Sequence, residues 1–186
     1  LSANEGINRF VWDMRYTSLP GIPGTYFENS FKGHKVSPGK YAIEIRVGTQ
    51  KSSVQAIVMA NPQYFTTSAG YVEYHEVMND MESKVRTMHV MVNGLYAKRN
   101  QLSELLTSLP ADAKYQPLKT DGEVLVKKME AWDKDMVQRL SKAYDDVENF
   151  PNKFTANYLF MVNQTESDIP QVNQPSLQLK KEMDLQ

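Results

Sequence analysis

The longest periodic run of apolar residues in the chain covers residues 71–109. Its apolar positions recur at spacings of three and four residues and are Tyr71, Tyr74, Met78, Met81, Val85, Met88, Val92, Leu95, Leu102, Leu106 and Leu109. Arg99 stands where the series would place another apolar side chain. A repeat that averages 3.5 residues keeps these side chains on one side of a helix, and it predicts a long helix, over about residues 67–109, packed against a partner helix. Such a helix spans roughly 60 Å.

A second helix with an apolar seam is predicted for residues 120–149. Thr120-Asp121-Gly122-Glu123 fits a capping box at its start, and Pro151 follows its end. Its seam positions are Leu125, Met129, Trp132, Met136, Leu140, Ala143, Val147 and Phe150. Because about ten residues join the two helices, we expect an antiparallel hairpin. Shorter helices are predicted for residues 153–164 and 176–186, so residues 64–186 form a helical bundle dominated by the hairpin.

Residues 1–63 show the alternation of β-strands. In residues 9–16 the apolar side chains Phe10, Trp12, Met14 and Tyr16 lie on one face. A loop rich in Pro and Gly follows. Residues 41–47 alternate again, and with residues 54–59 they predict a β-hairpin around a turn at residues 48–52. The predicted fold class is therefore α+β, with a small antiparallel β-module followed by an antiparallel helical bundle.

Composition excludes several classes of protein. The 186 residues are 41% hydrophobic and 23% charged, with a net charge of -1, as in ordinary globular proteins. No apolar run is long enough to cross a membrane. The absence of Cys excludes disulfides and thiolate chemistry. Neither half of the chain is basic enough to suggest nucleic-acid binding. The first residues have no initiator Met and no leader pattern, so we expect a piece of a longer protein or a mature product.

The titratable residues form no familiar catalytic or metal-binding pattern. His75 and His89 lie fourteen residues apart on the predicted long helix, about 21 Å along its axis, so they cannot share one ion. We interpret both as surface or seam-edge residues, and His34 has no assigned role. The carboxylates of the β-module have no spacing that brings two of them together as a glycosidase requires. No metal, cofactor or catalytic residue is predicted.

Three sequence pieces of the β-module carry a resemblance to a known family. These are the series ending in Trp12-Asp13-Met14-Arg15-Tyr16, the piece Pro38-Gly39-Lys40-Tyr41 with its alternating strand, and Asn61-Pro62 before a Thr-capped helix. Together they resemble the C-terminal region of large secreted bacterial propeller proteins, described as sortilin-like or BNR-repeat, glycosyl-hydrolase-related. The β-module is also similar to the Ig-like domain of the flagellar hook-capping protein.

The resemblance implies an Ig-like β-sandwich portion, incomplete at its N-terminus, followed by a helical bundle in an extracytoplasmic protein. The family usually has Asp-Pro-Arg where this chain has Asn61-Pro62-Gln63, so an ion pair between such side chains is lost. Any hydrolase activity would belong to the propeller, so no catalytic residue is carried over. Because the first strands of the family's module would precede residue 1, we expect an exposed apolar face or edge that an upstream domain or another chain covers.

The leading hypothesis for function is a non-catalytic structural or interaction module at the C-terminus of such a propeller protein. The alternatives are a fragment of a glycoside hydrolase and a carbohydrate-binding module that stacks sugars on Tyr26, Phe27 and Phe31 of the Pro/Gly-rich loop. Arg99 is expected to pair with an acidic residue of the second helix.

Overall fold

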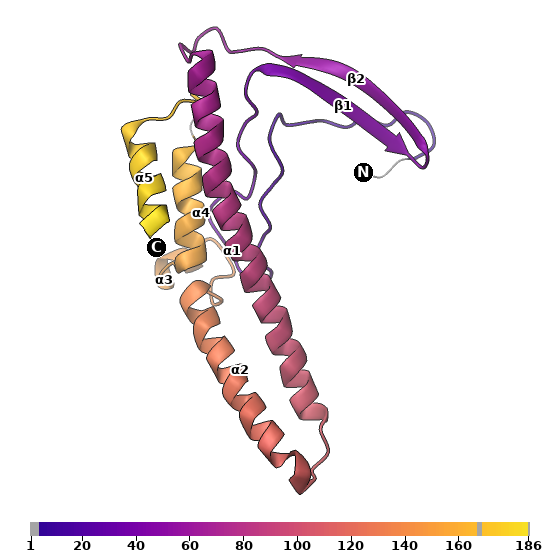
Figure 1. Cartoon of the computed structure of the whole chain (residues 1–186), viewed down its shortest axis with the longest axis vertical. Helices are drawn as coiled ribbons and strands as arrows, with labels where there is room; N and C mark the ends of the chain where they lie inside the picture. Colours follow the sequence, from indigo (N-terminus) through magenta and orange to yellow (C-terminus); the bar gives the residue numbers. More distant parts are fainter. Residues whose placement is uncertain (1–3, 167–168, 186) are drawn as a thin grey trace.

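The structure, a computed structural model, describes residues 4–166 and 169–185. Its elements are β1 (Gly39–Val47), β2 (Gln50–Val58), α1 (Ser68–Ser108), a 3-10 turn (Ala113–Tyr115), α2 (Gln116–Met136), α3 (Asp146–Asn149), α4 (Phe154–Thr165) and α5 (Gln174–Leu185). Figure 1 shows α1 along most of the long axis, with α2 beside its second half, α4 and α5 beside its first half, and the β-hairpin reaching away from its N-terminal end. The mixture of helices and an antiparallel sheet agrees with the predicted α+β class.

The long helix forms where the seam predicts it. The side chain of Thr67 caps its N-terminus by accepting the backbone N–H of Gly70 at 3.1 Å, and Pro110 follows its last turn. The seam is fully buried only over the first half of α1, where Tyr74, Met78, Met81, Val85 and Val92 expose 1% or less. From Leu95 onward no residue of α1 is buried.

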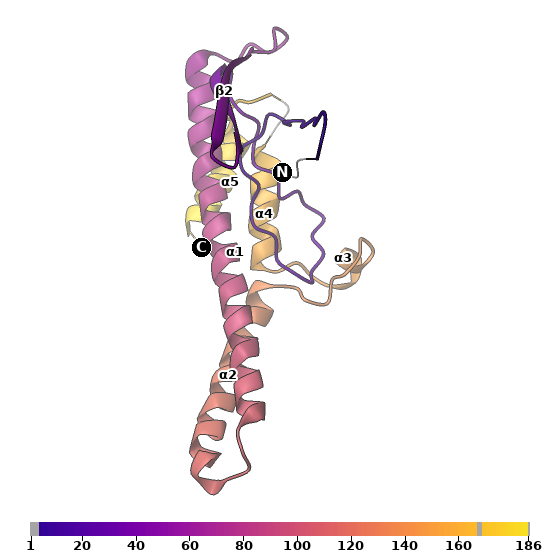
Figure 2. The ribbon, with the colours of Figure 1, turned by 90° about the vertical axis from the view of Figure 1, so that its right-hand side faces the viewer.

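For most of this buried half the partner is not the second helix, contrary to the prediction; α2 reaches it at Val92, through Met136. Leu159 and Val162 of α4, Met183 of α5, and Leu19 of the Pro/Gly-rich loop pack against it. Figure 2 shows α4 and α5 beside the upper half of α1, while α2 lies beside the lower half. The helical hairpin therefore forms the narrow end of the molecule. The main core lies around the first half of α1, where α4, α5 and the Pro/Gly-rich loop pack against this helix.

The second helix differs from its prediction in both bounds and orientation. It begins at Gln116, so Thr120 lies inside it and does not act as a cap, and it ends at Met136. Leu125 and Trp132 of the predicted seam expose 50% and 38%, whereas Gly122 and Asp133 are buried. A Cβ on Gly122 would lie 2.5 Å from Leu106 Cδ2, so this glycine lets the two helices approach closely. The two helices therefore meet at Gly122, and the predicted seam at Leu125 and Trp132 is exposed.

The predicted β-hairpin forms, but its turn consists of residues 48–49 and not 48–52, because β2 begins at Gln50. The sandwich around the hairpin is not confirmed. β1 and β2 pair in antiparallel register from Gly39 opposite Val58 to Val47 opposite Gln50. Gly48 has a φ of 59° in the two-residue turn, a conformation that glycine adopts without strain. The predicted strand over residues 9–16 does not form. In the described residues this segment has only an isolated bridge, between Arg15 and Lys35. In the part of the chain that the structure describes, no strand lies beside this segment to pair with it.

None of the described helices combines the length and the apolar character that crossing a membrane requires.

Candidate interaction surface

The most unusual surface of the molecule is the β-hairpin of residues 39–58, which we call the arm. Side chains directly opposed in an antiparallel pair lie on the same face of the sheet. The register of the two strands therefore defines one face of the arm, called its apolar face, which consists of Gly39, Tyr41, Ile43, Ile45, Val47, Gln50, Ser52, Val54, Ala56 and Val58. None of these ten residues is charged.

The opposite face of the arm carries all of its charges, and Ala42 and Ile57 are its apolar members. Its Glu44 carboxylate pairs with Lys51 across the hairpin and with Arg46 along the strand. Hydrogen bonds from Lys51, and then from Arg46, lower the pKa of Glu44. The arm is therefore amphipathic, like an antiparallel sheet that buries one of its faces against another part of a protein.

Nothing among the described residues covers most of the apolar face. Every residue from 42 to 55 is exposed, and Ile45 and Val54 expose 52% and 61%. Within the described residues each strand has one partner, so the backbone groups along both outer edges have no sheet partner there. An amphipathic two-stranded ribbon of this kind is marginally stable alone, and its open edges are templates for another strand.

The N-terminal segment adds further exposed apolar surface beside the arm. All residues from 4 to 14 are exposed, including Val11 at 80%. The segment contacts the apolar face through Trp12, whose ring lies 5.6 Å from the ring of Tyr41. The Nε1 of Trp12 also donates a hydrogen bond to the carbonyl of Arg15 at 3.2 Å. Figure 2 shows the first residues of this segment standing apart from the hairpin.

The other residues of the resembling motifs hold the base of the arm. The Arg15 guanidinium donates to the carbonyl of Gly33 at 2.8 Å and pairs with Glu166 at 2.6 Å. Asp13 accepts the backbone N–H of Arg15 at 3.2 Å. Pro38 precedes β1, Gly39 begins it, and the Tyr41 hydroxyl donates to the carbonyl of Ser37 at 2.6 Å.

A pocket of about 320 Å³ lies where the arm joins α1. Met14, Val36, Val58, Tyr64 and Tyr71 are among the residues that line it. Its wall is mainly apolar, and it continues the apolar surface of the arm toward the helices.

Under the arm, a chain of buried titratable groups joins the Pro/Gly-rich loop to α1. The Glu82 carboxylate accepts the backbone N–H of His34 at 2.7 Å and lies 3.0 Å from His34 Nδ1. His34 Nε2 lies 2.9 Å from His75 Nδ1. We call these three residues the His–Glu cluster. His34 exposes 1% and Glu82 exposes 4%, while His75 is half-buried.

Aromatic rings enclose the His–Glu cluster. The Tyr16 ring lies 4.5 Å from the ring of His34 and 4.8 Å from that of His75, and the Tyr74 ring meets His34 edge-on. Burial, and then the proximity of His34, lower the pKa of His75. Burial, and then Tyr41, raise the pKa of Tyr16.

Sequence reasoning missed this cluster, although a signal for it exists. His75, Glu82 and His89 are spaced by seven residues along α1, so they form one polar stripe beside the apolar seam. His89 is fully buried, not at the surface, and its Nδ1 lies 2.7 Å from the carbonyl of Pro20. The role of His34 depends on a loop whose path the sequence does not reveal.

The aromatic residues proposed as a sugar platform pack inward. Tyr26, Phe27 and Phe31 are all half-buried, and both Phe rings pack against the main core. The two Phe rings meet at 76°, and each also contacts the ring of His89. Sugar stacking needs exposed rings that share a plane, which this pair does not offer.

Arg99 has no ion pair to α2 in the described part of the chain. Its guanidinium lies over the ring of Tyr96 at 4.5 Å and donates to the side chain of Asn100 at 2.8 Å. Arg139 covers the same Tyr96 ring at 4.0 Å and holds the buried Asp133 carboxylate through two hydrogen bonds. Arg139, not Arg99, is the arginine that pairs with an acid of α2.

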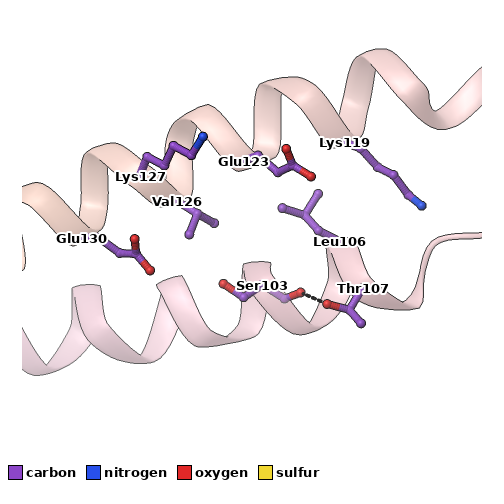
Figure 3. A pocket seen from close by; sticks show the side chains of 8 residues that line it. All are labelled: Ser103, Leu106, Thr107, Lys119, Glu123, Val126, Lys127 and Glu130. Carbon is purple, nitrogen blue, oxygen red and sulfur yellow. Dashed lines mark hydrogen bonds between the residues drawn. The ribbon is translucent and has the colours of Figure 1, made fainter.

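A shallow groove of about 420 Å³ lies between α1 and α2 near the tip of the hairpin. Figure 3 shows Leu106 and Val126 between the two helices, with charged side chains that include Lys119, Glu123 and Glu130 along α2. Acidic and basic groups alternate along its rim, so it presents no strong charge of either sign.

Within residues 4–166 and 169–185, no group of three or more His, Asp or Glu side chains is placed to hold a metal ion. No protein-family model matches the chain, and no curated protein or solved structure matches it significantly.

Proposed function

We propose that this chain is a non-catalytic interaction module, and that the apolar face of the arm binds a β-sheet of another protein domain. The observation that carries this proposal is the run of exposed residues from 42 to 55 in a hairpin that has all of its charged side chains on one face and most of its apolar side chains on the other. A partner for a face without charge has to be apolar itself, which favours protein over nucleic acid or a phosphorylated ligand.

The open edges specify the form of that partner. A β-strand of the partner can pair with an outer edge through backbone hydrogen bonds while its alternating side chains cover the apolar face. The resemblance to the C-terminal region of sortilin-like, BNR-repeat propeller proteins leads to the same expectation, since that region would receive strands from an upstream segment. On this proposal the chain works outside the cytoplasm, at the end of a larger protein.

The alternative functions have no specific observation in their favour. Glu44 is held by Lys51 and Arg46 on the polar face of the arm, and Asp13 is bound to the backbone of its own segment, so neither is presented as an acid of a sugar cleft. The packing of Phe27 and Phe31 described above does not supply a sugar platform.

Site-specific photocrosslinking in the producing cell tests the proposal. A photoreactive phenylalanine at Ile45 on the apolar face should crosslink to one defined peptide with alternating apolar residues, located by mass spectrometry either upstream in the same polypeptide or in another chain. The matched control is the same probe at Ser53, which is opposite Glu44 on the polar face and should give no such adduct. Equal crosslinking at both positions, or none at Ile45, would contradict the proposal.

A further inference from the structure

We propose that the pocket of about 320 Å³ at the base of the arm is an anchor site, which takes one aromatic side chain of the partner that covers the apolar face. We call this pocket the anchor pocket. Its fit to an aromatic ring is argued from its own lining residues, whereas a partner as the source of that ring rests on the proposed function.

The anchor pocket is continuous with the apolar face of the arm. Val58 belongs to both, because it lines the pocket and stands opposite Gly39 in the register of the hairpin. Ile45 is opposite Ser52, six residues before Val58, which is about 20 Å along the strand. A partner strand that covers Ile45 and follows the arm to its base therefore reaches the pocket six residues later. Because six is an even number, that residue points to the same side as the one that covers Ile45.

The wall of the anchor pocket suits an aromatic ring. It includes the rings of Tyr64 and Tyr71 and the thioethers of Met14 and Met59. Aromatic rings pack favourably against one another in offset or edge-to-face arrangements, and methionine sulfur makes favourable contacts with ring edges. The volume lies at the lower end of the range for ligand pockets, so the site suits one side chain better than a large ligand.

The polar lining residues favour a ring that carries a polar group. Asp13 and Asn61 line the pocket and are exposed, whereas Tyr71 in its wall exposes only 7%. An occupant therefore meets apolar surface on one side and hydrogen-bonding groups beside water on the other. The side chains of Trp and Tyr combine an apolar ring with one polar group, and both are frequent anchors of protein interfaces.

The backbone of Met14 is an independent sign that the pocket is built for a contact. Its φ of 56° is a left-handed conformation, which a methionine adopts only at a cost in free energy. The carbonyl of Met14 accepts the N–H of Val36 at 2.9 Å, and this bond holds the strained residue in place. Residues of this kind are concentrated at active sites and ligand clamps. The Met14 side chain is 53% exposed and can therefore contact an incoming ring.

Two aromatic residues of this chain that neighbour lining residues in the sequence do not fill the pocket. Phe65 follows Tyr64 but exposes 97%, and Trp12 precedes Asp13 but packs against the ring of Tyr41. Neither of them lines the pocket. The ring that we propose therefore comes from the partner.

Binding of indole tests the anchor pocket without the partner. In the 186-residue chain with ¹³C-labelled methionine methyl groups, indole should shift the NMR signals of Met14 and Met59 until they saturate. Met91 is the internal control, because it exposes 61% on α1 and does not line the pocket, so its signal should not move. Signals of Met14 and Met59 that do not move, or that move no more than that of Met91, would refute an aromatic site.

Two variants assign the indole site to the pocket wall. Tyr64→Ala removes a ring of the wall and should weaken indole binding about fivefold or more. Tyr144→Ala is the matched control, because this ring is 61% exposed and lies outside the pocket, so the affinity should not change. If Tyr64→Ala does not fold, Met59→Ala removes a side chain that is 83% exposed and should weaken binding about twofold or more. Unchanged affinity in the folded variants would refute the assignment.

Photocrosslinking in the producing cell tests the source of the ring. A photoreactive phenylalanine at Met59 should attach to the peptide that the same probe marks from Ile45. The attachment should be about seven residues away, at or beside a Trp or Tyr, because Met59 follows Ser52 by seven residues. An adduct from Ile45 with none from Met59, or a Met59 adduct far from any aromatic residue, would refute the anchor and leave the interaction function standing. No adduct from Ile45 would contradict the interaction function, and with it a partner as the source of the ring.

Discussion

Val85 in α1 and Ile45 in β1 are both β-branched apolar residues placed on one face by a clear periodic pattern, yet Val85 is fully buried and Ile45 exposes 52%. Around Val85, α4, α5 and the Pro/Gly-rich loop close over the first half of α1. Around Ile45 the described structure provides only the second strand of the hairpin. Periodicity thus identifies the face that an element has to bury, and the rest of the assembly determines whether it is covered.

The largest expected effect comes from truncating matched aliphatic side chains in the two regions. Leu159→Ala removes a fully buried side chain of α4 and should lower the free energy of unfolding by about 2–5 kcal/mol. Ile45→Ala removes a similar side chain from the arm and should change the free energy of unfolding by less than about 0.5 kcal/mol. Urea unfolding followed by circular dichroism measures both. Similar losses for the two variants would show that the arm is covered by its own chain.

The joint between the two regions can be disturbed at Gly33. A Cβ there would lie 2.5 Å from the carbonyl oxygen of Tyr16 and 2.7 Å from its carbon, and backbone atoms cannot move aside cheaply. Gly33→Ala should therefore destabilise the protein by about 1–3 kcal/mol, as overpacking typically does. Gly94→Ala is the control, since a Cβ at this exposed helical position has open space, and alanine should stabilise α1 by up to about 1 kcal/mol. Equal effects of both substitutions on the melting temperature would contradict the close contact.

The helical region should also lose stability in mild acid. Burial is the main cause that lowers the pKa of His89, against the opposing effect of the carbonyls of Pro20 and Thr155. The unfolded chain therefore binds a proton at higher pH than the folded chain does. Stability should be complete above pH ~6.5 and decrease as the pH falls below it, with His89 contributing at most about 1.4 kcal/mol per unit. Urea unfolding between pH 7.5 and 5.5 should show a smaller slope for His89→Gln, and an unchanged slope would exclude His89 as a source.

The sequence predicts the elements that depend on local chemistry. It fails for α2, where two faces of the helix could each pack against α1. The start of α1 follows from a Thr cap, and the β-hairpin follows from the alternation of its strands. Both form, although β2 begins at Gln50, earlier than predicted. In α2 the seam through Leu125 and Trp132 looks stronger than the one through Gly122 and Asp133, yet the second faces α1. Gly122 faces α1 because it lets Leu106 approach closely, and Asp133 can be buried because Arg139 pairs with it. Both effects depend on tertiary neighbours, which the periodicity of the sequence does not reveal.

The same limit applies to the candidate sites. The alternation of residues 41–47 locates the apolar face of the arm directly, and the heptad spacing of His75, Glu82 and His89 could have indicated a polar stripe on α1. Nothing in the sequence places His34 against that stripe, because the loop carrying it reaches α1 through tertiary contacts such as the hydrogen bond from the His34 backbone N–H to Glu82.

The smallest expected change in the free energy of unfolding is that of Arg99→Leu. This substitution tests whether an apolar side chain in the second half of α1 is covered enough to add stability. Arg99 interrupts the seam, but it forms no ion pair to α2 and its contact with the Tyr96 ring is shared with Arg139. Leucine restores the apolar series in a region where the seam is only half-buried, so loss of the cation–π contact and gain of apolar contact should nearly cancel, within about 0.5 kcal/mol. Arg139→Leu is the contrast, because it leaves the buried Asp133 carboxylate without its partner and should cost several times more in urea unfolding. If Arg99→Leu proved the more damaging of the two, the tip of the hairpin would depend on a charge pair to α2 after all.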